Sequence, residues 1–105
     1  MIRILPADNK EGEYILWDGD TACGKAIATF DGCVRLLTVE APDALLMEGM
    51  VRAVLNAGRI REIERAVCEN KELFPLLKCL EFTSCDEGME VSIPDFFFRG
   101  CKGCQ

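Results

Sequence analysis

The sequence contains no histidine, and this absence excludes several kinds of chemistry. Catalysis by a Ser-His-Asp triad or a Cys-His pair needs the imidazole ring, as do the common histidine-containing zinc sites. A block of basic residues is also absent, because 12 lysines and arginines stand against 18 aspartates and glutamates, a net charge of −6. Proteins that bind nucleic acid through its phosphates have the opposite balance, so no nucleic-acid partner is expected.

Long apolar runs are absent as well. The N-terminus has no apolar run of signal-peptide length, and no stretch approaches the ~18 apolar residues of a membrane-spanning helix. We therefore expect no membrane partner. Seven cysteines are present, an odd number that fits a closed set of disulfides poorly. Thiols stay reduced in a chain that is not exported, so we expect a cytoplasmic protein with reduced cysteines, several of them acting as small core hydrophobes.

The length and composition predict one packed unit. Half of the 105 residues are hydrophobic, and no internal repeat or linker divides them. We expect residues 1–105 to form a single domain in which residues 94–105 are an irregular tail rich in cysteine and phenylalanine.

The first third has the pattern of an antiparallel meander. Residues 13–17 are rich in β-formers and precede a turn signal at Asp18-Gly19-Asp20. Residues 22–30 can return antiparallel to a second turn at Asp31-Gly32. The third strand, residues 33–39, is almost continuously apolar, which favours burial on both faces.

The apolar residues then change to helical spacing. Pro42-Asp43 suits the start of a helix over residues 44–57, and Gly58 suits its end. The elements expected after it are a strand over 63–68, a helix over 72–80, and a hairpin formed by 81–84 and 89–93. This order predicts a mixed α/β (α+β) fold, with a largely antiparallel sheet and two main helices.

The second half resembles the GNAT superfamily of N-acetyltransferases. The resemblance rests on the helix, on the strand after it, on the pattern Asn70-x-x-Leu73-x-x-Leu76-Leu77-x-x-Leu80-x-Phe82, and on the hairpin that follows. It covers roughly residues 13–93, and Asn70, Leu76 and Phe82 match the family pattern directly. Two helices that normally lie between the family's first two strands are absent from this order.

The resemblance implies a cofactor site for acetyl-CoA between two splayed parallel strands. Those strands correspond to residues 33–39 and 63–68, and the pantetheine arm is implied to bond the backbone of Leu37, Thr38 and Val39. Asn70 is assigned to the same site. No metal is implied.

Two family features have no counterpart in this sequence. The positions of the pyrophosphate loop fall on Pro42, Leu45 and Met47, although the physics of phosphate binding calls for glycine and free backbone N–H groups. The tyrosine that acts as general acid falls on Leu77, which has no proton to donate. Glu40 is the candidate for a catalytic base, since some members keep a base after the central strand.

Three functions stay open at this point. The first is an N-acetyltransferase-like, acyl-CoA-related protein with weak, altered or lost activity. The second is a non-catalytic interaction or regulatory module that binds a partner or small ligand in the strand cleft. The third is a thiol redox or metal-binding protein that uses Cys101 and Cys104, for which packed free thiols are the simpler interpretation.

The two absent helices also bear on partners. Without them, apolar side chains such as Ile15, Trp17, Leu36 and Leu37 need another cover. Either the tail that contains Phe96-Phe97-Phe98 folds back over them or a second copy of the chain does. We therefore expect a homodimer through that sheet face or through an exposed sheet edge.

Overall fold

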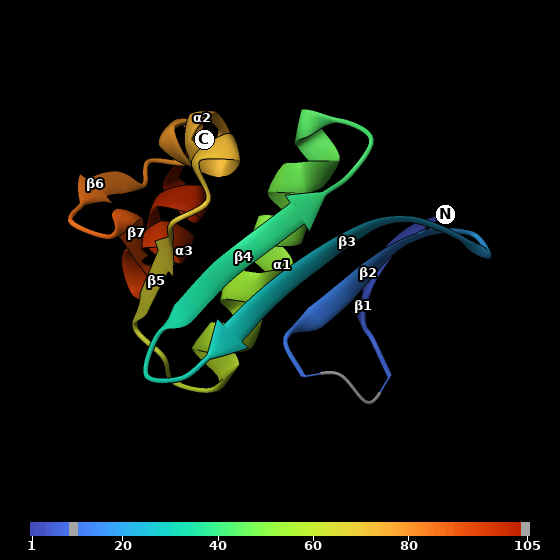
Figure 1. The fold of residues 1–105 in the computed structure, drawn as a ribbon, viewed down its shortest axis with the longest axis horizontal. Helices are drawn as coiled ribbons and strands as arrows, with labels where there is room; N and C mark the ends of the chain where they lie inside the picture. The colour runs from blue at the N-terminus through green and yellow to red at the C-terminus, as the bar shows by residue number, and fades with distance from the viewer. Residues whose placement is uncertain (9–10, 104–105) are drawn as a thin grey trace.

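The computed structural model describes residues 1–8 and 11–103, which form one seven-stranded sheet packed against helices (Figure 1). The strands are β1 (Ile2–Pro6), β2 (Glu13–Asp18), β3 (Thr21–Phe30), β4 (Val34–Glu40), β5 (Arg65–Cys68), β6 (Thr83–Cys85) and β7 (Gly88–Ser92). Their order across the sheet is β1-β2-β3-β4-β5-β7-β6, and β4 and β5 form its one parallel pair among the described strands. The predicted mixed, largely antiparallel sheet is confirmed.

Strand β1 was not predicted. It pairs antiparallel with β2 in a register that sets Arg3 opposite Trp17. Five residues that end in a proline give too short a pattern to separate an edge strand from a loop.

Helix α1 (Ala44–Ile60) crosses one face of the sheet behind β4 (Figure 1). It extends past the predicted stop because Gly58 is a packing residue within the helix. A Cβ atom on Gly58 would lie 2.4 Å from Val34 Cγ2, so the glycine permits close approach to β4. None of the helices in the described chain is both long and apolar enough to cross a bilayer.

The turn after β5 is helical, as predicted. Asn70 caps a short 3₁₀ helix, η1 (Lys71–Leu73), which continues into α2 (Phe74–Cys79). Pro75 lies in the first turn of α2, where its absent N–H has no partner to lose.

The predicted irregular tail is wrong over residues 94–103, which belong to helix α3 (Ile93–Gly103). Pro94 is compatible with a helix because it lies in the first turn. The ring of Phe96 contacts that of Phe82 edge-on at 6.2 Å between centroids, and the Arg52 guanidinium of α1 lies 5.1 Å from the Phe96 ring. Helix α3 therefore packs beside α1 on the same face of the sheet.

The opposite face of the sheet is called the open face below. The sequence predicted that Leu36 would need a cover on this face, and that prediction is wrong. Leu36 is fully buried and points to the helical face, so it needs no further cover. Ile15 and Trp17 are half-buried on the open face, where they alternate with the buried Tyr14 and Leu16. Helix α3, which contains the predicted tail, packs on the helical face and does not cover Ile15 and Trp17.

Candidate functional site

The two parallel strands separate after a short ladder. β4 and β5 pair at Val34 with Ala66, at Arg35 with Val67, and at Leu36 with Cys68. β5 ends there, whereas β4 continues to Glu40 with only β3 as a described neighbour. The space between the ends of β4 and β5 is called the fork below, and it lies where the sequence placed the cofactor site.

β4 contains a β-bulge where the ladder with β5 ends. Ala28 of β3 faces Leu36, but the preceding residue, Ile27, faces Thr38, which leaves Leu37 as the extra residue. The bulge breaks the alternation of the strand, so Leu37 is 43% exposed while Val39 returns to the core. Among the predicted cofactor residues, Leu37 therefore lies at the mouth of the fork, and the side chain of Val39 does not face it.

Asn70 connects the two arms of the fork. Its Nδ2 donates to the carbonyl oxygen of Leu37 at 3.1 Å, and its Oδ1 accepts from the backbone N–H of Glu72 at 3.0 Å. The structure thus joins Leu37 and Asn70, which the sequence had assigned to one site. Glu40, the candidate base, is exposed at the end of β4 and lies opposite Lys25 in the sheet register.

The backbone of β4 beyond Leu36 suits a ligand that is extended and carries amide groups. A strand with a neighbour on one side presents N–H and C=O groups on the other, and an added chain can bond them. The pantetheine arm that the resemblance implies at Leu37, Thr38 and Val39 stays a prediction.

The start of α1 does not fit the pyrophosphate of acetyl-CoA. Asp43 is the N-cap, and its Oδ1 accepts from the backbone N–H of Leu46 at 2.8 Å. This places a carboxylate where a helix would otherwise attract an anion. Pro42 contributes no N–H, and the first turn contains no glycine to admit a phosphate.

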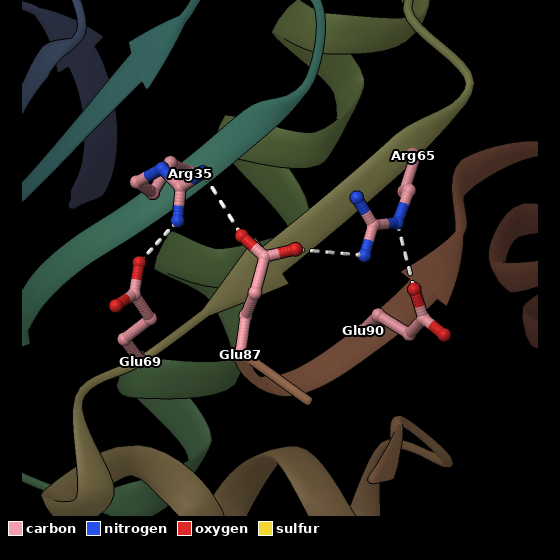
Figure 2. A network of polar contacts seen from close by, with 5 residues as sticks. All are labelled: Arg35, Arg65, Glu69, Glu87 and Glu90. Atoms are coloured by element: carbon pink, nitrogen blue, oxygen red, sulfur yellow. Dashed lines mark hydrogen bonds and ion pairs between the residues drawn. The ribbon is translucent and has the colours of Figure 1, made fainter. Parts of the chain in front are cut away.

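A network of ion pairs covers part of the open face next to the fork (Figure 2). Arg35 pairs with Glu69 and, at 3.3 Å, with Glu87; Arg65 pairs with Glu87 at 3.3 Å and with Glu90 at 2.7 Å. Arg35 and Glu90 flank Val67 in the register, and Val67 is fully buried. The charged side chains thus shield an apolar residue that the helices do not reach.

This network was not predicted from the sequence. Its residues come from β4, from β5, from the turn after β5 and from the β6–β7 hairpin, so no local motif contains them. The available signal was the presence of Arg35 and Arg65 inside otherwise apolar strands.

The network holds its central carboxylate in the ionised form. Hydrogen bonds from Arg65 and Arg35 lower the pKa of Glu87 below its ordinary value. The hydrogen bond to Glu87 raises the pKa of Arg35. The pKa of Arg65 is raised chiefly by its hydrogen bond to Glu90 and secondly by that to Glu87. The hairpin is in this way fastened to both strands of the parallel pair.

The lowered pKa of Glu87 predicts an acid-sensitive contribution to stability. A carboxylate with a depressed folded-state pKa stabilises the protein above its unfolded pKa, and this contribution is lost as the pH falls through the folded value. We expect Glu87→Gln to lower the Tm at pH 6, and the difference from wild type to narrow below roughly pH 4. Thermal denaturation between pH 3 and pH 7 measures both. Glu64→Gln, at an exposed position outside the network, is the control, and a constant difference at all pH values would contradict the prediction.

The described cysteines are not joined by disulfides. Cys23, Cys33, Cys68, Cys79 and Cys85 are free. Burial raises the pKa of the Cys68 thiol, which lies fully inside the core and is a poor nucleophile.

Cys101 and Cys104, the pair considered for metal binding or redox chemistry, are only partly within the structure. The side chain of Cys101 and all of Cys104 lie outside the described residues. Within the described part of the chain, no three histidine, cysteine or acidic side chains gather as metal ligands would.

Comparison with solved structures identifies the scaffold. The chain superposes on the ribosomal-protein-S18-alanine N-acetyltransferase of Escherichia coli with a TM-score of 0.64, over 81% of this chain and 72% of that one. The fold is acetyltransferase-like. The two sequences are 14% identical, a level at which the likeness concerns the fold alone. No protein-family model matches the sequence, and no curated protein matches it at a significant level.

Proposed function

We propose that this protein is a binding module that uses an acetyltransferase-like scaffold without catalysing acetyl transfer from acetyl-CoA. The observation that carries the proposal is the Asp43 carboxylate at the N-terminus of α1. A second feature supports it: Leu77, at the family's general-acid position, is fully buried in the core, where it offers neither a proton nor a path to solvent.

Electrostatics gives the physical reason. The first backbone N–H groups of a helix attract an anion because they have no partners within the helix and carry the positive end of its dipole. Asp43 uses one of these groups and supplies its own negative charge. A pyrophosphate in the same position would meet a carboxylate at short range, and the net charge of −6 adds to the repulsion.

The fork is the proposed binding site. Its β4 edge, on which Asn70 occupies the Leu37 carbonyl, suits an extended, amide-bearing ligand, and its charged surroundings favour one without phosphate groups. A peptide segment has both properties. Asn70 would be its nearest side-chain neighbour, because Asn70 already donates to the Leu37 carbonyl in the fork.

An acyl-CoA-dependent N-acetyltransferase is the second candidate function. The same edge of β4 at Leu37 to Val39 favours it, because a pantetheine arm also offers amide groups to a strand that has a neighbour on one side only. The two candidates differ in whether the phosphates of the cofactor are accepted at α1.

Calorimetric titration of the reduced protein with acetyl-CoA and with CoA tests this difference. We expect no measurable binding up to about 1 mM, which corresponds to less than about 4 kcal/mol of binding free energy. Asp43→Ser keeps a helix cap but removes the charge, and we expect it to bind CoA more tightly than wild type does. Micromolar binding to wild type that weakens on Asn70→Ala would overturn the proposal and support the transferase.

A further inference from the structure

The two edges of the sheet are not alike. β6, at one edge, has three residues, Thr83 to Cys85, and a short edge strand offers little to an incoming chain. β1, at the other edge, has five residues and includes the exposed side chains of Ile2 and Leu5. Within the described chain, β1 pairs only with β2, so its outer side is an unpaired, apolar edge.

The backbone direction of β1 follows from the bonds at its ends. The N–H of Ala7 donates to Glu13, and the carbonyl of Met1 accepts from Gly19, so residues 1 and 7 face β2. Because backbone groups alternate along a strand, Arg3 and Leu5 also face β2. Ile2, Ile4 and Pro6 therefore present their backbone groups outward.

The backbone groups of Pro6 face away from β2, so its missing N–H removes no hydrogen bond within this chain. The outward edge offers two donors, from Ile2 and Ile4, and three acceptors, from Ile2, Ile4 and Pro6. This set is self-complementary in an antiparallel two-fold pairing centred on Ile4. Each Ile4 then bonds its counterpart, and each Ile2 N–H donates to the other copy's Pro6 carbonyl, which gives four hydrogen bonds.

Charge and proline select this register over its neighbours. A pairing centred on Arg3 also forms four bonds, but it sets the two Arg3 side chains directly opposite each other, which is destabilising. A pairing centred on Leu5 forms only two bonds, because Pro6 has no donor. With Ile4 at the centre, each Arg3 lies opposite Leu5 of the other copy.

A groove beside β1 can receive the Ile2 side chain of the second copy in this register. It lies between β1 and α1, has a volume of about 690 Å³, and is lined by apolar residues such as Ile4, Pro6 and Ile60 together with the polar Glu11, Asn56 and Arg61. Ile60 is 72% exposed. Ile2 shares the helical face with Ile4 and Pro6, so pairing Ile2 with the other copy's Pro6 brings its side chain to this groove.

We propose that the outer edge of β1 binds a second copy of this chain, through an antiparallel two-fold pairing centred on Ile4 that continues the sheet across the dimer. The occupant is a copy of the same chain because the donors, the acceptors and the groove are complementary within one sequence. The site lies at the far edge from the fork and does not depend on the function proposed above.

Removal of one outward donor tests the pairing. Ile2→Pro keeps the bonds to β2, because the Ile2 N–H faces outward, but it eliminates two of the four bonds in the dimer. At about 1 kcal/mol for each bond, we expect the dimer dissociation constant from sedimentation equilibrium to rise roughly thirtyfold. Ile2→Val, which keeps the N–H and a branched side chain, is the matched control. A wild-type protein that is monomeric at 0.5 mM, or an Ile2→Pro variant that dimerises like Ile2→Val, overturns the proposal.

Disulfide trapping tests the register and does not depend on the behaviour of Ile2→Pro. Arg3 and the other copy's Leu5 form a non-hydrogen-bonded pair, for which the Cα atoms lie about 4.5 Å apart, within the range of a disulfide. We expect a mixture of Arg3→Cys and Leu5→Cys proteins to form a 3–5 crosslink that peptide mass spectrometry identifies. Wild type gives the background from the native cysteines. The absence of a 3–5 crosslink above background contradicts the register.

Discussion

Replacement of Phe96 by alanine is expected to lower the free energy of unfolding by about 3–5 kcal/mol, as is usual for a buried phenylalanine. The Phe96 ring is 4% exposed, contacts Phe82 and Phe97, and lies beneath the Arg52 guanidinium. Domains of this size are stable by about 5–15 kcal/mol, so the loss is a large part of the total. Urea denaturation followed by far-UV circular dichroism measures it.

Phe98 supplies a control two residues away in the same helix. It is 68% exposed, and we expect Phe98→Ala to cost less than about 1 kcal/mol. Equal losses for the two variants would mean that α3 does not pack against α1 through Phe96.

Replacement of Gly88 by alanine is expected to cost about 3–5 kcal/mol, through backbone strain and overpacking together. Gly88 has a φ of +141°, a conformation that residues with a Cβ atom rarely adopt. A Cβ atom there would lie 2.2 Å from the carbonyl oxygen of Cys68, so β5 and β7 would have to move apart. The neighbouring residue is Glu87, so the ion-pair network would be disturbed as well.

Gly32 is a control that distinguishes backbone strain from overpacking. Its φ is also positive, at +76°, but a Cβ atom on it would have nothing within 4 Å. We expect Gly32→Ala to cost only about 1 kcal/mol, the price of the backbone conformation alone. If Gly88→Ala costs no more than Gly32→Ala in the same urea experiment, the close approach of Gly88 to β5 is not as the structure has it.

The central elements could be predicted from the sequence because their patterns are local. The meander over β2 to β4 has turn signals at both connections, and α1 has a cap and a regular apolar stripe. β1 and α3 could not be predicted from the sequence, each for a different reason. β1 is too short to show a period, and α3 begins Ile93-Pro94, a pair that favours a break until tertiary packing around Phe96 is known.

Two of the candidate site residues lie in contact, and their role in a cofactor site stays a prediction. The resemblance brought Leu37 and Asn70 into one site, and the hydrogen bond between them confirms that they are neighbours. The bulge at Leu37 could not be predicted, because it depends on the register of β3 against β4. The ion pairs escaped prediction for a similar reason, since Arg35 and Glu87 are 52 residues apart in the chain.

The open face has a consequence for the size of the protein. A sheet with helices on both faces is a three-layer structure, and each layer requires its own stretch of chain. Here five charged side chains lie over the parallel strands in place of a layer of helices. The apolar side chain that they must cover there is that of Val67. Seven strands therefore fit into 105 residues, as a two-layer architecture in which salt bridges on the outer surface stand in for a second core.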